Sequence, residues 1–387
     1  MKLLLYSHFF APSVGGVETL VLSLARGLAG MRDAQGRARF EVTLVTQTAA
    51  EGFRDDAWPF RVVRRPGVLQ LRGLIRGSDV VQVAGPALSP IVIGLLGGKP
   101  VIVEHHGFQT ICPNGQLLIE PAGIPCPGYF MAGKHRECLR CNAGRGWPAS
   151  LKLWALTFVR RFLCRRVAAN ITPTAWLGGL VQLPRTTAVA HGLEHRTDAV
   201  GREKSPSAVR VIAFQGRLVT TKGVKVLFEA ARILSEQGRA FELMVIGDGP
   251  ERAELERVVP EASLEGRVRF TGRLNGNELE TALVEAEVVV VPSLGGEVFG
   301  LVVAENMGRG LPVIASDLGA FVEVIGDAGL TFRTGDAKEL AEALRKVLDD
   351  PELASRLAKR GQERAEEFCN FLRMLEAHAR IYEQARS

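Results

Sequence analysis

Residues 209–249 read VRVIAFQGRLVTTKGVKVLFEAARILSEQGRAFELMVIGDG. Two apolar runs, 209–216 and 241–249, enclose a segment at 223–238 in which apolar residues recur at helical spacing. A strand, a helix and a second strand in this order are typical of a βαβ unit with two parallel strands. The stretch therefore predicts an α/β domain whose sheet is buried on both faces.

The same alternation of strand and helix extends in both directions from this unit. In the first half we expect strands at 2–7, 40–46, 80–85, 100–106 and 170–174, and helices at 17–30, 89–98 and 150–168. In the second half we expect strands at 268–272, 288–293 and 312–316, a helix at 277–286 and helical structure from Lys338. This pattern predicts two Rossmann-like, doubly wound α/β domains, with the cleft between them as the default ligand site.

The length and composition of the chain agree with two domains. It has 387 residues, of which 47% are hydrophobic and 42 are glycine, unlike a fibrous or disordered chain. The polar stretch 192–208 predicts a linker between an N-terminal domain at 1–191 and a second domain at 209–365. We expect 108–148, rich in Cys, Gly and Pro, to be an irregular insertion, and 366–387 to be a helix that crosses back to the first domain.

Charge is distributed unevenly along the chain. Residues 1–190 carry a net charge of +12 and the remainder −6, within a total of +6. A basic half suggests an anionic partner, either a membrane surface or a phosphorylated substrate, although a merely uneven distribution is an alternative. The apolar run at the N-terminus is short for a signal peptide, and the uncharged runs 80–98 and 167–184 are interrupted by proline and polar residues. We therefore expect a cytoplasmic protein with reduced thiols, with peripheral contact at the inner face of the membrane as a further hypothesis.

Two glutamates, Glu297 and Glu305, flank the almost wholly apolar segment EVFGLVVAE. If these residues formed one helix, the two side chains would lie about 12 Å apart along its axis, which is wider than the roughly 5–9.5 Å between paired glycosidase carboxylates. Gly300 instead favours a loop that ends where a helix begins, with Glu297 in the loop and Glu305 one turn into the helix. The amides of Phe299, Gly300 and Leu301 would then face an anion. Two surface glutamates near a helix start are the alternative.

Two further loops, one with two glycines and one with two cations, each follow a predicted strand. Gly15 and Gly16 follow the first strand and open a helix, so a ligand could approach the backbone there, although a simple tight turn is an alternative. Arg217 and Lys222 lie on the loop after 209–216, where they could clamp a diphosphate. Two solvated cations are the alternative for that loop.

The predicted strand at 100–106 ends in EHHG, with His105 and His106 at the carboxyl edge of the first sheet. Side chains alternate between the two faces of a strand, so at most one of these rings is expected to face a ligand. A hydrogen-bonded scaffold residue is the alternative for either histidine.

Four of the six cysteines lie in the predicted insertion: Cys112, Cys126, Cys138 and Cys141. The last two have the spacing of a zinc knuckle. We expect a structural zinc site with four thiolates; an iron–sulfur cluster, scattered reduced thiols and a redox disulfide are alternatives.

The predicted helix at 150–168 interleaves aromatic residues with Arg160, Arg161, Arg165 and Arg166. Such a helix could lie on an anionic membrane. A packed helix with a solvated basic face is the alternative.

Taken together, these segments resemble the retaining glycosyltransferases of family 4, and the cysteine-rich insertion resembles that of a subgroup. The resemblance spans nearly the whole chain and rests on EVFGLVVAE followed by NMGRGLPVIASDLGA, and on GRLVTTKG, VIGDGPERAELE, FTGRL and FAPSVGGVETLVLSLARGL. It implies the GT-B fold, in which two Rossmann-like domains face each other across a cleft.

The resemblance also implies roles for individual residues of the second domain. Arg217 and Lys222 would bind the diphosphate of a nucleotide-sugar donor, and Glu305 would hold its ribose. Glu297 would contact the donor sugar, with the amides of residues 299–301 nearby.

In the first domain, Gly15 and Gly16 would approach the donor phosphates. His106 matches the active-site histidine of the family and is therefore preferred to His105. The chain departs from the common family pattern at Asn306, where alanine is usual.

The implied activity is transfer of a sugar from a nucleotide-diphosphate sugar to a hydroxyl acceptor, with retention at the anomeric carbon. The acceptor would be a glycan or a lipid-linked molecule. The sequence lacks an Asp-x-Asp motif, so we expect no catalytic metal. A nucleic-acid-binding protein is the alternative from another class, but it leaves the second-domain motifs unexplained, so we expect no nucleic-acid partner. A nucleotide-sugar epimerase of the same architecture would turn over the donor without an acceptor.

Overall fold

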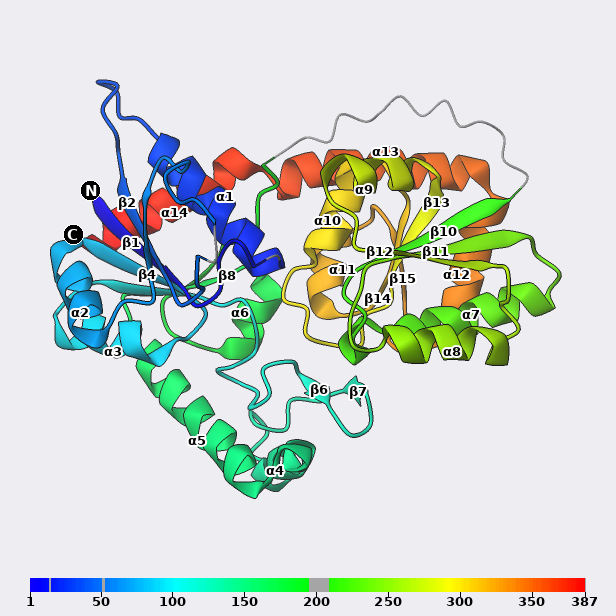
Figure 1. The fold of residues 1–387 in the computed structure, drawn as a ribbon, viewed down its shortest axis with the longest axis horizontal. Helices are drawn as coiled ribbons and strands as arrows, with labels where there is room; N and C mark the ends of the chain where they lie inside the picture. Colours follow the sequence, from blue (N-terminus) through cyan, green and yellow to red (C-terminus); the bar gives the residue numbers. More distant parts are fainter. Residues whose placement is uncertain (14, 51–52, 195–208, 387) are drawn as a thin grey trace. The chain divides into compact units, whose positions relative to one another are not determined.

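The computed structural model describes residues 1–13, 15–50, 53–194 and 209–386. The chain divides into two compact units, each an α/β domain with a parallel sheet (Figure 1). The first unit comprises 1–115, 128–194 and 370–387, and the second comprises 116–127 and 195–369. Most of the linker predicted at 192–208 lies outside the described residues.

The first unit is built on a seven-stranded sheet in the order β3-β2-β1-β4-β5-β8-β9. Its strands are β1 (Lys2–Ser7), β2 (Glu41–Thr46), β3 (Arg61–Arg64), β4 (Val80–Ala84), β5 (Val101–Glu104), β8 (Ala169–Thr172) and β9 (Thr186–Ala188). The direction of strand order reverses between β1 and β4, which pair side by side in parallel. In open parallel sheets, ligands bind at such a switch point, beyond the carboxyl ends of the strands.

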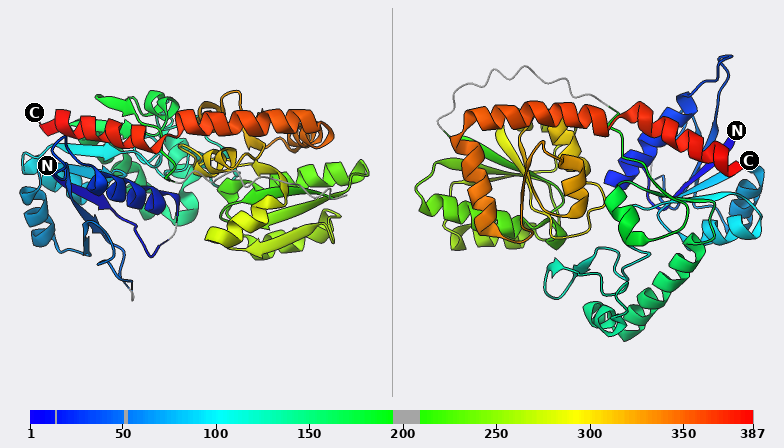
Figure 2. Two further views of the ribbon diagram at one scale, coloured as in Figure 1. Left: turned by 90° about the horizontal axis from the view of Figure 1, so that it is seen from above. Right: turned by 180° about the vertical axis from the view of Figure 1, so that it is seen from behind.

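The helices of the first unit are α1 (Gly16–Gly30), α2 (Val68–Gly77), α3 (Leu88–Leu96), α4 (His135–Cys141), α5 (Trp147–Cys164), α6 (Ala175–Val181) and α14 (Phe371–Arg386). Helix α1 buries Leu20, Leu24 and Leu28, which recur at four-residue spacing and therefore form one apolar face. Helix α14 packs beside α1 (Figure 2), and Met374 and Leu375 join the same buried cluster. The last helix of the chain thus completes the core of the first unit.

The second unit has a six-stranded parallel sheet in the order β12-β11-β10-β13-β14-β15. Its strands are β10 (Arg210–Gln215), β11 (Phe241–Ile246), β12 (Val268–Gly272), β13 (Ala286–Val291), β14 (Val313–Ser316) and β15 (Leu330–Phe332). Its helices are α7 (Val224–Glu236), α8 (Arg252–Glu261), α9 (Gly276–Val284), α10 (Leu301–Gly308), α11 (Gly319–Ile325), α12 (Ala337–Asp349) and α13 (Pro351–Phe368). Here the switch point lies between β10 and β13.

Close backbone packing shapes the carboxyl edge of the second sheet. Gly223 has a φ of 65°, and a Cβ added there would lie 2.0 Å from the carbonyl oxygen of Pro292. This position therefore admits only glycine without displacement of the backbone. The loop after β10 is thereby pressed against the loop after β13.

The cysteine-rich insertion is shared between the two units, which differs from the prediction that it belongs wholly to the first domain. It contains the short strands β6 (Leu118–Ile119) and β7 (Ile124–Pro125), α4 and the 3-10 turn η1 (Ala143–Arg145). Residues 116–127 group with the second unit because the Gln116 carbonyl accepts a 2.7 Å hydrogen bond from the Gly296 amide. Gly295 also lies against Leu118.

Candidate functional site

A partly buried charged pair lies at the switch point of the second unit. Lys222, in the loop after β10, places its Nζ 2.5 Å from Oε1 of Glu297, in the loop after β13. Ser293 donates a 2.9 Å hydrogen bond to the same oxygen. The side chains of Lys222 and Glu297 are 24% and 12% exposed, so water screens the pair only in part. Two residues that the sequence suggested separately are thus in direct contact.

Backbone hydrogen bonds hold the loop that carries Glu297. The Leu294 amide donates to the Thr221 carbonyl at 2.7 Å, next to Lys222. The Gly296 amide donates to Gln116 on the other side of the loop. The carboxylate is therefore presented by a backbone that is fixed on both sides.

Helix α10 begins immediately after Gly300, which confirms the predicted change from loop to helix. Gly300 has a φ of 97°, and a Cβ there would lie 2.6 Å from the ring of Phe321. The side chain of Phe299 is buried and its ring stacks on Phe368, with centroids 6.2 Å apart. The side chain of Phe299 is therefore part of the packing, and the role predicted for this residue concerns its backbone.

Glu305 lies one turn into α10, on the predicted helix. Partial burial raises the pKa of its carboxyl above the ordinary value, although the side chain is still 34% exposed, and Arg309 partly offsets this effect. Nη1 of Arg309 lies 3.8 Å from Glu305, and its Nη2 bonds Glu280 at 2.8 Å. Sequence analysis missed Arg309, although its position four residues after Glu305 is the spacing of a helical ion pair.

Asn306 ties α10 to the end of β10. Its side-chain amide donates to Oε1 of Gln215 at 3.0 Å and to the Val302 carbonyl at 2.7 Å. Because Gln215 ends the strand that precedes Lys222, this bond links the two predicted donor-binding segments. Sequence analysis noted the unusual residue but gave it no role.

The other residues predicted to bind a donor lie at their expected places in the chain. Arg217 is exposed in the loop after β10 and has no ion-pair partner among the residues that the structure describes. Gly16 is the first residue of α1, and Gly15 precedes it with extended backbone. A Cβ at Gly15 would meet only the flexible end of Glu18, so local packing alone does not demand glycine there.

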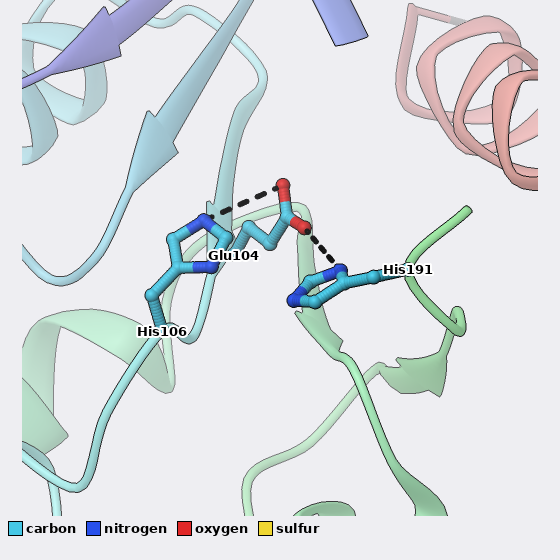
Figure 3. A group of neighbouring side chains, drawn as sticks. All are labelled: Glu104, His106 and His191. Atoms are coloured by element: carbon cyan, nitrogen blue, oxygen red, sulfur yellow. Dashed lines mark ion pairs between the residues drawn. The ribbon is translucent and has the colours of Figure 1, made fainter. Parts of the chain in front are cut away.

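The first unit contains a buried carboxylate surrounded by imidazoles (Figure 3). Glu104, the last residue of β5, is 1% exposed, and its Oε2 accepts a 2.7 Å hydrogen bond from Gln82. Nε2 of His106 lies 3.8 Å from Oε2, and Nδ1 of His191 lies 3.9 Å from Oε1. Burial alone would raise the pKa of Glu104, but the neighbouring imidazoles, which include His378, hold it well below its ordinary value.

The two histidines of the EHHG segment have different surroundings. His105 is fully buried and donates from Nε2 to Oδ1 of Asn170 at 3.0 Å, and burial lowers its pKa to about 4. It is thus a neutral, hydrogen-bonded scaffold residue. Within the described part of the chain, both ring nitrogens of His106 are buried and neither has a hydrogen-bond partner, although Nε2 faces Glu104.

The same cluster is a place where side chains of metal-ligating type gather, which sequence analysis did not predict. Glu104, His106 and His191 each offer one ligand atom, and these atoms lie within 4.8 Å of one another. A carboxylate and neutral imidazoles are ligands that zinc accepts. The His378 ring also lies beside this carboxylate, 3.5 Å away.

The four insertion cysteines do not all belong to one unit. Sγ of Cys112 donates to Oδ1 of Asn114 at 2.9 Å, and Nδ2 of Asn114 lies 3.6 Å from Sγ of Cys141. Cys138 lies three residues before Cys141 on α4, whereas Cys126 belongs to the segment that groups with the second unit. Three of the predicted ligands are therefore in the first unit, and the zinc site stays a prediction.

Comparison with known proteins identifies a family of related sequences. The sequence model described as Glycosyl transferases group 1 matches residues 196–364. The alpha-D-kanosaminyltransferase of Streptomyces kanamyceticus is 33% identical over 278 residues, which cover 70% of this chain and 67% of that protein. The 2-deoxystreptamine glucosyltransferase of the same organism is 38% identical over 143 residues, but these cover only 36% of this chain and 37% of that protein.

The fold has close structural neighbours. The crystal structure of HepE from Anabaena in complex with UDP and glucose superimposes with a TM-score of 0.72, over 98% of both chains and at 17% sequence identity. At this identity the likeness concerns the fold alone. The fold is GT-B, with two Rossmann-like α/β domains, and the chain belongs to the family of glycosyltransferases described as Glycosyl transferases group 1.

Proposed function

We propose that this protein transfers a sugar from a nucleotide-diphosphate sugar to a hydroxyl acceptor, with retention at the anomeric carbon. The observation that carries the proposal is the Lys222–Glu297 pair at the switch point of the second unit. This pair lies on loops that end next to the start of α10, where amide groups lack partners within the helix. A cation, a carboxylate and a helix N-terminus there suit the phosphate and sugar parts of one ligand.

In the second unit, Arg217 and Lys222 would contact the donor diphosphate. When the bond between sugar and phosphate breaks, negative charge develops on the departing diphosphate, and these cations and the amides of residues 299–301 would stabilise it. Because the chain supplies positive charge itself, the proposal needs no catalytic metal. Glu297 would contact the sugar and Glu305 the ribose hydroxyls.

In the first unit, Gly15 and Gly16 would let the start of α1 approach the donor phosphates. His106 would act beside the reacting sugar and the acceptor hydroxyl. Its ring nitrogens have no hydrogen-bond partner among the described residues, which suits a group that must exchange a hydrogen bond with a ligand.

A thermal-shift panel of UDP, GDP, ADP and TDP tests the donor site. A nucleotide that binds only the folded protein stabilises it by about 2.7 kcal/mol at a concentration of 100 Kd. We expect at least one of the four to raise the melting temperature of the wild type and to lose this effect in Lys222→Ala. Lys225→Ala, which removes an exposed lysine of α7, is the control that keeps the shift. A wild type that responds to none of the four would contradict the proposal.

For the acceptor, we propose a lipid-linked molecule reached from an anionic membrane surface through α5. Trp147, Leu151, Phe158 and Phe162 are 64%, 53%, 41% and 54% exposed and lie on one face of this helix, which extends away from the sheet of its unit (Figure 1). A stripe of exposed aromatic and aliphatic groups favours burial at an interface.

Arginines beside this stripe supply the charge that an anionic surface would attract. Arg165 and Arg166 are exposed at the end of α5, and the Arg166 guanidinium lies 3.5 Å from the centre of the Phe162 ring. Arg160 and Arg161 are partly buried instead, and Arg161 bonds the Val181 carbonyl at 2.6 Å. Of the four arginines in the basic face predicted from sequence, two are therefore exposed to solvent and two are partly packed against the protein.

Co-sedimentation with vesicles tests this surface. We expect the protein to bind vesicles that contain phosphatidylglycerol at low salt and to release on addition of salt, since the attraction is screened. Phe158→Ser/Phe162→Ser should lose binding, whereas Leu372→Ser, at a 72% exposed leucine of α14, should retain it. A wild type that ignores anionic vesicles at low salt would exclude the membrane surface.

We also retain structural zinc as a proposal for Cys112, Cys126, Cys138 and Cys141. Metal analysis of the purified protein should give about one zinc per chain, and Cys138→Ser/Cys141→Ser should lose it. Wild-type protein without zinc after purification in zinc-containing medium would remove this proposal.

No helix among the described residues is both long and apolar enough to cross a membrane.

A further inference from the structure

The C-terminal helix α14 delivers a histidine to the buried carboxylate of the first unit. His378 is completely buried, and its Nδ1 lies 2.9 Å from the Met374 carbonyl oxygen. A carbonyl oxygen only accepts hydrogen bonds, so Nδ1 carries a proton. Nε2 faces Oε2 of Glu104 at 3.5 Å. A bare nitrogen lone pair would repel the carboxylate, so this geometry favours a proton on Nε2 too, which makes the ring an imidazolium.

The same helix acts on Glu104 by a second route. Tyr382, one turn after His378, donates its hydroxyl proton to Oε1 of Gln82 at 2.5 Å. This bond fixes the Gln82 amide so that Nε2 donates to Glu104 at 2.7 Å. The carboxylate is thereby held by a cation from α14 and by an amide that α14 orients.

His106 lies beside the same carboxylate. Its Nε2 is 3.8 Å from the same Oε2 of Glu104 that His378 faces. That oxygen attracts a proton to Nε2 of His106, which leaves Nδ1 as the acceptor nitrogen of a neutral ring. Since His378 already balances the charge of Glu104, the second imidazole has no need to become charged.

We propose that His378 and Tyr382 are positioning residues for His106: through Glu104 and Gln82 they fix the orientation of its ring. The consequence for sugar transfer rests on the proposed function, whereas the effect on the His106 ring does not. The C-terminal helix is, in this account, a functional part of the acceptor-side site as well as a part of the core.

The charged and titratable groups around His106 agree with this assignment. Burial lowers the pKa of His106, Glu104 and Glu18 of α1 raise it, and His378 lowers it. Burial alone would lower the pKa of His378, but Glu104 and the bond to Met374 raise it. Burial lowers the pKa of His191 to about 3, so that ring is neutral and adds no charge.

The direct test follows the histidine rings of the whole protein by carbon-13 NMR. The chain has seven histidines, and His106→Gln identifies the signal of His106. In the wild type we expect His106 to titrate below the ordinary histidine range. In His378→Gln its titration should move to higher pH, because the balancing cation is gone, and in Glu104→Gln/His378→Gln it should return to low pH. An unchanged His106 titration in His378→Gln would overturn the proposal.

A milder variant keeps the test valid if His378→Gln does not fold. Tyr382→Phe removes one hydroxyl and keeps the ring that packs edge-on against Phe40. It frees the Gln82 amide, so the His106 signal should shift in this variant; an unmoved signal would count against the proposal. Addition of stoichiometric Co²⁺ gives a further outcome. A ligand-field spectrum that is lost in Glu104→Gln would show a metal site in place of the His378–Glu104 ion pair and would overturn the proposal.

Turnover separates positioning from a purely structural role. The donor in this assay is UDP-glucose, GDP-mannose, ADP-glucose or TDP-glucose, according to which diphosphate binds. We expect Tyr382→Phe and His378→Gln to lower kcat for donor cleavage at least about 10-fold. The KM for the donor and the thermal shift by the diphosphate should not change. Normal kcat would overturn the positioning role. If no diphosphate binds the wild type, the proposed function fails while the NMR result still stands.

Discussion

Lys222 and Glu297 form an ion pair that their sequence motifs do not predict. Each has a partly buried charge, and each is the partner of the other at 2.5 Å. When a donor binds, its phosphates would compete with Glu297 for Lys222. The pair would therefore hold the cation in place before a donor arrives.

The pair predicts a measurable coupling. Lys222→Met and Glu297→Gln should each lower the free energy of unfolding by about 1–3 kcal/mol, because each leaves one partly buried charge without its partner. The double variant should lose less than the sum of the two. Urea unfolding of all four proteins gives the coupling energy, and simple additivity would contradict the contact.

Glu305 predicts a pH dependence of stability. Its pKa is raised in the folded protein, mainly by burial, so folding favours the protonated form. The stability that this group contributes is present at low pH and is lost as pH rises through its folded pKa. Glu305→Gln removes this loss, so its stability relative to the wild type should be higher at pH 7 than at pH 4. Urea unfolding at both values measures the difference; a relative stability that falls with pH would contradict the sign.

At the scale of elements, the sequence predicted the parts whose pattern is strong. Buried Val, Ile and Leu runs identified the central strands, and Gly300 identified the start of α10. The missed elements include β3, β6, β7, β9, β15, α2, α4, α6, α8 and α11, and most of them are short or mainly polar. Strand β9, for example, has only three residues, and its pairing with β8 depends on tertiary contacts.

The N-terminus of α10 gives a prediction at this scale. Gly300→Ala should lower the free energy of unfolding by about 1–3 kcal/mol, because alanine disfavours its positive φ and the new Cβ would press on the Phe321 ring. The matched control is Gly179→Ala in α6, where no atom lies within 4 Å of an added Cβ. The control should be neutral or stabilising by about 0.5–1 kcal/mol. Equal losses in the two variants would argue against the strained cap.

At the scale of the whole molecule, each of the two α/β units presents candidate functional side chains at the carboxyl edge of its parallel sheet. The resemblance carried by short motifs led to the fold, because those motifs occur where strands end. It did not lead to the His378–Glu104–Gln82 cluster, because these residues are far apart in sequence and meet only when α14 packs on the first unit. Nor did it show that residues 116–127 would group with the second unit.

The measurement that tests the central claim most directly compares the thermal shift produced by the binding diphosphate in three variants. The account predicts that Glu305→Ala loses more of the shift than Glu297→Ala. A nucleoside diphosphate keeps the ribose that Glu305 would contact, but it lacks the donor sugar that Glu297 would contact. Lys225→Ala should retain the wild-type shift. A full shift in both glutamate variants would contradict a nucleotide-sugar site at the switch point of the second unit.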